Sequence, residues 1–207
     1  FTCVKPFGVW TMTFDGKVRI DIEVLAPTST IVLHAANLTF GSSALVAKGG
    51  KPQAAKVSVD ADQQTATFAF DKPLAPGRYT LSTDYAGVIN TQANGLFALD
   101  YPTESGQKRA LFTQFENSDA RKFVPSWDEP NFKATFDLTV NAPSGQMVVS
   151  NMPAASEKVL GNGLTQVAFQ RTPKMSTLLL FLSLGEFARA KARAEGGTVI
   201  GEIALKG

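Results

Sequence analysis

KVRIDIEVL, residues 17 to 25, is the stretch that decides the fold of this chain. Its apolar side chains are Val18, Ile20, Ile22 and Val24, and they alternate with Lys17, Arg19, Asp21 and Glu23. Residues two apart share one face of a β-strand. The stretch therefore predicts a strand that is buried on one face and solvated on the other. The Asp15-Gly16 pair just before it is typical of a tight turn, so we expect the strand to begin after Gly16.

Short alternating segments recur along the rest of the sequence. They are Thr30 to Leu33, Lys56 to Val59, Thr65 to Phe70, Arg78 to Tyr85, Phe136 to Val140, Met147 to Ser150, Thr165 to Gln170 and Leu178 to Leu184. Breaks such as Pro76-Gly77 and Asn162-Gly163 separate them, at the spacing typical of a sandwich or barrel. We therefore expect an all-β fold.

The stretch from Glu186 to Glu195 carries two conflicting signals. It is rich in alanine, arginine and lysine, which favour helix. Its alanines, however, alternate strictly with Arg189, Lys191 and Arg193, which is the period of a strand. We favour a solvent-facing strand here.

Composition narrows the class of protein. With 207 residues, 44% hydrophobic and 18% charged, the chain is globular and long enough for one large all-β domain or two small ones. A net charge of +2 without a basic run argues against nucleic acid as a partner. The longest apolar stretch, Leu178 to Leu184, is far shorter than the about 20 residues of a membrane span.

Cysteine and histidine are too scarce for a metal site. The one cysteine, Cys3, excludes an intrachain disulfide and is expected to be inert; it leaves the compartment open between cytoplasm and bacterial periplasm. The one histidine, His34, lies in an apolar run, and we expect a satisfied structural histidine rather than a metal ligand. We therefore expect no metal site in this chain and no activated thiol at Cys3.

The segment Thr113 to Phe136, TQFENSDARKFVPSWDEPNFKATF, concentrates the polar residues of interest. If it begins as a strand, Gln114 and Glu116 project from one face and Thr113 and Phe115 from the other. A carboxylate beside an amide is suited to binding a free ammonium group, because the first takes the charge and the second adds a directional hydrogen bond. The alternative for Glu116 is an ordinary surface ion pair with Arg121 or Lys122.

The remainder of this segment is expected to be structural. Ser118 could cap a helical turn through its hydroxyl, and Asp119 and Arg121 could tie the loop together. Trp127 is expected to fill the core. Two carboxyl groups close together can serve as general acid and general base. Adjacent residues point to opposite faces of a strand, however, so we expect Asp128 and Glu129 to accept hydrogen bonds from backbone N–H groups or arginines instead.

This segment strongly resembles the signature strand and loop of the aminopeptidase N family, which are zinc exopeptidases of the H-E-x-x-H class. Further similar blocks are Phe14 to Val18, Thr30 to Leu38, Tyr79 to Gly87, Ser150 to Pro153 and Pro173 to Phe187. The sequence departs from the family where Asn117 replaces a common proline and Ser126 a common cysteine. The zinc motif needs two histidines on one helical face, and this chain has one.

The resemblance implies a non-catalytic N-terminal domain of such an enzyme. The implied fold is a saddle-shaped, multi-sheet β-sandwich, with residues 1–207 as a single domain or two fused sub-sandwiches. The residues matching Gln114 and Glu116 line the first specificity pocket in that family, and the one matching Glu116 helps to bind the α-amine of a peptide N-terminus. Zinc belongs to the full-length enzyme, on a C-terminal catalytic domain that would be this domain's partner, so the isolated chain is expected to be inactive.

A different class of function stays open on the sequence alone. An autonomous β-sandwich module for binding or adhesion would show the same strand pattern, because one fold serves many unrelated tasks. The two readings differ in whether the coding sequence continues into H-E-x-x-H. As an isolated piece, the chain would leave apolar surface uncovered, and we expect some self-association.

Overall fold

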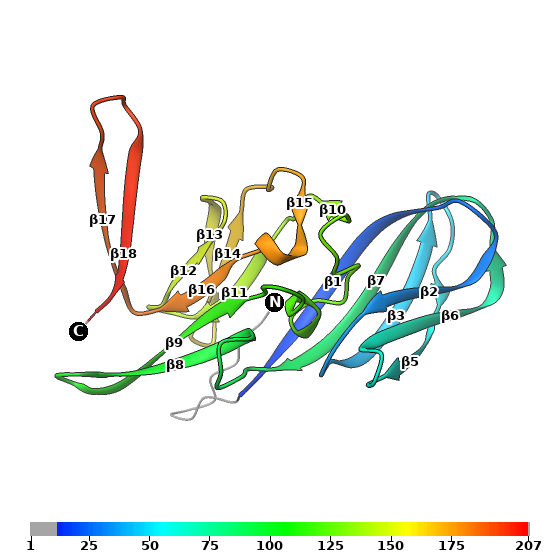
Figure 1. Ribbon diagram of the computed structural model, residues 1–207, viewed down its shortest axis with the longest axis horizontal. Helices are drawn as coiled ribbons and strands as arrows, with labels where there is room; N and C mark the ends of the chain where they lie inside the picture. The colour runs from blue at the N-terminus through cyan, green and yellow to red at the C-terminus, as the bar shows by residue number, and fades with distance from the viewer. Residues whose placement is uncertain (1–11, 207) are drawn as a thin grey trace.

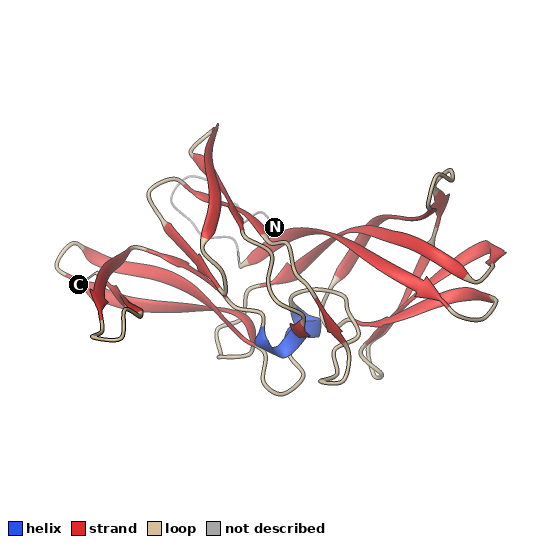
Figure 2. Cartoon of the chain, turned by 90° about the horizontal axis from the view of Figure 1, so that it is seen from above, coloured by secondary structure: helices blue, strands red, loops and turns tan. Residues whose placement is uncertain are grey.

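The computed structural model describes residues 12–206, and β-strands dominate them (Figure 1). Within residues 12–206 every strand pair in the sheets is antiparallel, and the helical content is two short 3-10 turns, η1 (Ala120–Lys122) and η2 (Thr177–Leu179). Both turns lie near the middle of the molecule (Figure 2). The predicted all-β fold is confirmed.

The N-terminal half consists of two facing sheets. One has the order β1-β7-β3-β4, and the other the order β2-β6-β5. Between them, the ring of Phe40 meets that of Phe68 edge-on, with the centroids 5.5 Å apart. The strands are β1 (Thr13–Val24), β2 (Thr28–His34), β3 (Thr39–Ala47), β4 (Gln53–Ala54), β5 (Lys56–Asp60), β6 (Thr65–Leu74) and β7 (Gly77–Val88).

The predicted turn at Asp15-Gly16 is wrong, because both residues lie inside β1. Gly16 pairs with Tyr85 of β7. A Cβ atom on Gly16 would lie 2.3 Å from Cζ of Tyr85. The glycine is therefore required by the close approach of an aromatic ring rather than by a turn.

The C-terminal half repeats the arrangement with a sheet of order β12-β16-β9-β8 and one of order β11-β14-β13. At the β13–β14 hairpin, Asn162 and Gly163 both have positive φ, 51° and 73°, as a two-residue hairpin turn requires. The strands are β8 (Gly95–Thr103), β9 (Gly106–Gln114), β11 (Thr139–Pro143), β12 (Met147–Ser150), β13 (Ala154–Gly161), β14 (Leu164–Phe169) and β16 (Leu182–Gly185), with a small ribbon of β10 (Lys133–Ala134) and β15 (Met175–Ser176).

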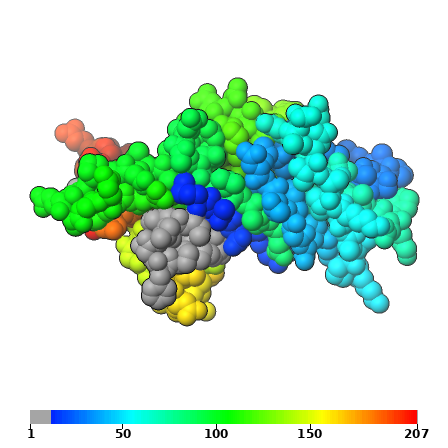
Figure 3. All heavy atoms as spheres, turned by 90° about the horizontal axis from the view of Figure 1, so that it is seen from below, coloured from blue at the N-terminus to red at the C-terminus, as the bar shows by residue number. Residues whose placement is uncertain are grey.

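One hydrophobic core runs through both halves. Its buried members include Phe14 and Leu81 from the first half and Phe115, Val140 and Leu184 from the second. The space-filling view shows the resulting elongated molecule, with the N-terminal strands at one end and the C-terminal residues at the other (Figure 3). The two halves share a continuous apolar interior.

Two predicted strands are shorter than expected. The segment Leu178 to Leu184 begins as η2, and only Leu182 onward is strand. The side chain of Asn151 accounts for the late start, since it accepts a hydrogen bond from Phe181 N and donates one to Leu179 O. In the segment Phe136 to Val140, the strand begins only at Thr139.

The last hairpin, β17 (Phe187–Arg193) with β18 (Val199–Leu205), stands away from the body (Figure 1). This confirms the strand that we favoured over a helix. Phe187 anchors its base in a small cluster with Tyr101 and Ala110. Beyond the base, β17 is exposed on both faces, and β18 is largely so.

Candidate functional site

Gln114 and Glu116 project to solvent at the end of β9. Gln114 and Glu116 are exposed, whereas Thr113 and Phe115 are 9% and 2% exposed. This confirms the predicted alternation of faces. Inside, the Thr113 hydroxyl accepts a hydrogen bond from Leu182 N at 2.9 Å, which ties β9 to β16.

The two polar side chains are coupled locally. Oε1 of Gln114 accepts a hydrogen bond from the backbone N–H of Glu116 at 3.0 Å. That bond orients the amide of Gln114 and leaves a second lone pair of Oε1 available to another donor. Gln114 and Glu116 thus present two exposed acceptor groups within two residues of each other.

The Glu116 carboxylate has no hydrogen bond or ion pair with any residue between 12 and 206. The ion pairs that we considered as an alternative do not form. Arg121 binds Asp128 instead, with Nε 3.2 Å from Oδ2, and Lys122 binds Asp119, with Nζ 2.9 Å from Oδ1. Glu116 is thus free to meet a cation that does not belong to the described part of this chain.

The segment that follows Glu116 is a compact loop around η1. The Phe115 and Phe123 rings pack 5.5 Å apart beneath it, and Asp119 N donates to Phe115 O at 3.0 Å. The predicted Ser118 cap is wrong. Asp119 occupies the N-cap position without a side-chain cap bond, while Ser118 donates to the Asn117 side chain.

Asp128 is the buried anchor of this loop. Its carboxylate, 1% exposed, accepts hydrogen bonds from the backbone N and Nε of Arg121 at 3.1 and 3.2 Å. Its other oxygen accepts one from the Thr177 hydroxyl at 2.8 Å. These contacts confirm that Asp128 satisfies backbone donors and an arginine. Trp127 packs on the core, as predicted.

His34 joins the same loop to β2. Its Nδ1 accepts a hydrogen bond from Asp128 N at 3.1 Å, and its backbone exchanges hydrogen bonds with Ser126 at 2.8 and 3.2 Å. Its Nε2 lies 4.0 Å from the Glu129 carboxylate. The expectation of a satisfied structural histidine is confirmed.

The residues described here do not fit a zinc site. Within residues 12–206, no group of three or more His, Cys, Asp or Glu side chains could hold a metal ion. Cys3, the expected inert thiol, lies outside the described residues. No helix in the described range is long and apolar enough to cross a membrane.

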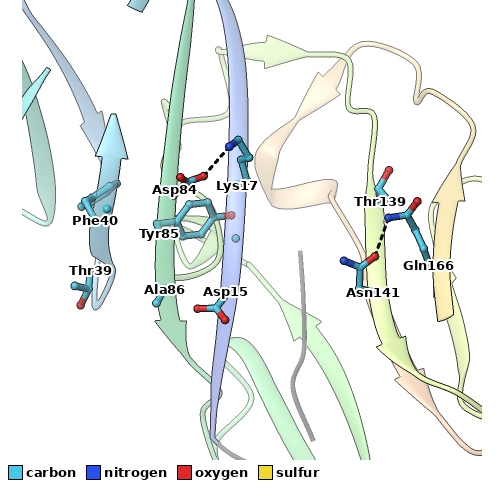
Figure 4. A pocket seen from close by; sticks show the side chains of 12 residues that line it. Asp15, Lys17, Thr39, Phe40, Asp84, Tyr85, Ala86, Thr139, Asn141 and Gln166 are labelled. Carbon is cyan, nitrogen blue, oxygen red and sulfur yellow. Dashed lines mark hydrogen bonds and ion pairs between the residues drawn. The ribbon is translucent and has the colours of Figure 1, made fainter. Parts of the chain in front are cut away.

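A hollow of about 650 Å³, which no sequence pattern indicated, lies between the two halves (Figure 4). Tyr85 and the Lys17–Asp84 ion pair line it on one side, and Asn141 and Gln166 on the other. Burial raises the pKa of Tyr85. Neither Gln114 nor Glu116 lines it, so this hollow and the exposed acceptor pair are separate features.

A family model and several known proteins match this chain, and their descriptions agree with one another. The model of the peptidase M1 N-terminal domain matches residues 3–179. Aminopeptidase N of Acetobacter pasteurianus is 39% identical over 186 residues, covering 89% of this chain and 51% of that protein. Aminopeptidase M1 of Arabidopsis thaliana is 37% identical, with coverage of 84% and 20%.

An animal relative extends the comparison. Endoplasmic reticulum aminopeptidase 1 of Mus musculus is 30% identical over 200 residues, covering 94% of this chain and 22% of that protein. The chain thus spans about half the length of the bacterial relative and about a fifth of the other two.

Proposed function

Because this chain belongs to the peptidase M1 N-terminal domain family, we propose that it serves as the substrate-orienting, non-catalytic domain of a zinc aminopeptidase. Glu116 and Gln114 bind the free α-amine of a peptide and line the pocket for its first residue. Both the family match and the named relatives favour this role over an autonomous adhesion module.

One observation carries the proposal: among residues 12–206, the exposed carboxylate of Glu116 has no partner although two cations lie five and six residues away. Surface acids usually have no special role, but the backbone of this one orients the exposed amide of Gln114, two residues earlier in the chain. A protonated amine gives such an acceptor pair a charge-assisted hydrogen bond, which is stronger than a neutral one. The arrangement suits the end of a peptide rather than its middle, because a peptide nitrogen carries no charge.

The contribution grows when a second domain covers the site. A hydrogen bond to a charged group contributes about 1.5–3 kcal/mol to stability or binding, and exposure to water lowers this. A catalytic domain packed over Glu116 would displace water and strengthen the attraction. The exposed position of Glu116 in this chain is therefore compatible with a site that two domains share.

The work of this chain is then orientation, not bond breaking. Zinc would supply the activated water in the full-length enzyme, and the described residues offer no site for it. Holding the amine fixes which peptide bond reaches the reactive centre, which removes orientational freedom before the reaction. An acidic side chain introduced elsewhere on the surface should not hold the amine in this way.

The test is the Glu116→Ala variant of a polypeptide in which this chain precedes its catalytic domain. We expect kcat/KM for an aminoacyl anilide to fall at least about tenfold, or roughly 1.4 kcal/mol. Glu104→Ala, which removes an exposed glutamate from the far end of the same β8–β9 hairpin, should have no effect. Unchanged kinetics for Glu116→Ala would remove that residue from the site.

A further inference from the structure

The loop between Glu116 and Asp128 contains two cations and two acids besides Glu116 itself, and their pairing is selective. Arg121 pairs with Asp128 and Lys122 with Asp119. Either cation is close enough in sequence to neutralise Glu116 if it were released. The structure thus raises the question of what keeps both of them away.

Asp128 holds Arg121 by more than charge. Arg121 is 13% exposed, and its guanidinium reaches Asp128 Oδ2 through Nε and Asp128 O through Nη2, each at 3.2 Å. A further nitrogen, Nη1, donates to the Gln64 side chain at 3.2 Å. Two of the three contacts thus hold the guanidinium on Asp128, and the third ties it to Gln64 of the N-terminal half.

Asp128 is itself held in place by groups from two distant strands or turns. Thr177 of η2 donates to its carboxylate, and His34 of β2 accepts from its backbone N–H. Because Nδ1 of His34 accepts this bond, the ring carries its proton on Nε2. Asp128 is therefore held at its carboxylate by η2 and at its backbone by β2, in addition to its contacts with Arg121.

Asp119 restrains Lys122 in the same manner, at a more solvated position. Their side chains are 24% and 22% exposed. The Lys122 ammonium also donates to Asn94 Oδ1 at 3.2 Å, and its Cβ would lie 2.9 Å from a Cβ placed on Gly95. Lys122 is thus directed toward the β7–β8 connection.

We propose that Asp119 and Asp128 are positioning residues that occupy the loop's own cations, so that Glu116 stays available for a substrate amine. Without them, Arg121 or Lys122 pairs with Glu116 and competes with the amine from within the molecule. This inference rests on the proposed role of Glu116. It assigns the two acids a role in amine affinity in addition to folding.

The test compares two ways of breaking the same ion pair in the polypeptide that carries the catalytic domain. Asp128→Asn removes the negative charge that holds Arg121, whereas Arg121→Met removes the cation itself. Both variants lose the pair and its contribution to stability. We expect KM for an aminoacyl anilide to rise about fivefold in Asp128→Asn with kcat within about twofold, and KM to stay near the parent value in Arg121→Met.

The double variant Asp128→Asn with Arg121→Met gives the rescue. Removing the released cation should bring KM back to within about twofold of the parent. A purely structural role of Asp128 predicts the opposite, namely that the double variant is at least as impaired as the single one. Equal effects of Asp128→Asn and Arg121→Met would likewise overturn the inference.

If Asp128→Asn does not fold, the more solvated pair of Asp119 and Lys122 tests the same proposal. By the same reasoning, Asp119→Asn should raise KM, whereas Lys122→Met should leave it unchanged. Equal effects of these two variants would overturn the inference. Glu116→Ala separates the two proposals. If it leaves kcat/KM unchanged, the proposed function is wrong; if it lowers kcat/KM but the paired variants behave alike, only the present inference is wrong.

Discussion

At the scale of single residues, burial separates two aspartate–arginine pairs of the same chemistry. Asp128 and Arg121 are 1% and 13% exposed, whereas Asp137 and Arg171 are 61% and 66% exposed. Hydrogen bonding to Arg171 lowers the pKa of Asp137, even though that carboxylate is solvated. Water competes with the hydrogen bonds of the exposed Asp137–Arg171 pair, whereas it cannot replace those of the buried Asp128–Arg121 pair.

We therefore predict that Asp128→Ala lowers the free energy of unfolding by about 3 kcal/mol, because it leaves Nε and the backbone N–H of Arg121 without their acceptor and the guanidinium without its counter-ion. Urea unfolding followed by fluorescence measures this loss. Asp137→Ala is the matched control and should change stability far less. Similar losses in both variants would contradict the importance of burial here.

At the scale of elements, sequence alternation was reliable where one face of a strand meets the core. It identified most of β1 and the orientation of Gln114 and Glu116. It missed β3, where the run Gly41-Ser42-Ser43-Ala44 has no apolar alternation and pairing with β7 holds the strand. It also missed β13, whose residues are all exposed and so leave no pattern.

The ion pairs of the candidate site could not be derived from the sequence for a related reason. Local spacing suggested Glu116 with Arg121 or Lys122. The actual partner of Arg121 is selected by Thr177 and His34, which lie 49 and 94 residues from Asp128. The partner of a charged side chain is decided by tertiary contacts, and a local sequence pattern carries no information about them.

Close packing between β1 and β7 gives a prediction for glycine. A Cβ on Gly87 would lie 2.4 Å from Cζ of Phe14 and 2.9 Å from Cδ2 of Leu38. Gly87→Ala should lower the free energy of unfolding by about 1–3 kcal/mol through overpacking. Gly201→Ala in β18 is the control, because a Cβ atom placed there would have no atom within 4 Å apart from those of its chain neighbours. It should be neutral in thermal unfolding.

The β17–β18 hairpin should be the least protected part of the strand framework. A two-stranded ribbon is marginal by itself, and this one is mostly solvated. We predict that its amide hydrogens exchange faster than those of β9 and β16 in a native-state hydrogen-exchange experiment. Equal protection would show that another surface covers the hairpin in solution.

At the scale of the whole molecule, apolar side chains remain exposed at several places. Val199 and Ile200 on the hairpin are 56% and 55% exposed, and Leu179 at η2 is 55% exposed. Whether the shared core makes residues 1–207 a single folding domain stays a prediction. The exposed side chains nevertheless define surface that a second domain could cover.

We accordingly predict that the isolated chain self-associates as its concentration rises, since uncovered apolar surface favours association. Light scattering over a dilution series should show a mass above 22.1 kDa at the high end. A monomeric mass throughout would contradict this. Substituting Val199 and Ile200 with threonine should reduce the association if the hairpin contributes to it.

The bridge between His34 and Ser126 has a consequence for how the protein is made. It joins segments that leave the ribosome far apart in time, so the loop that follows Glu116 cannot settle until β2 and the later η2 have both arrived. A half-synthesised chain would therefore carry Glu116 without a fixed direction. The proposed recognition of a peptide end would then be acquired only after the residues of η2 have been synthesised.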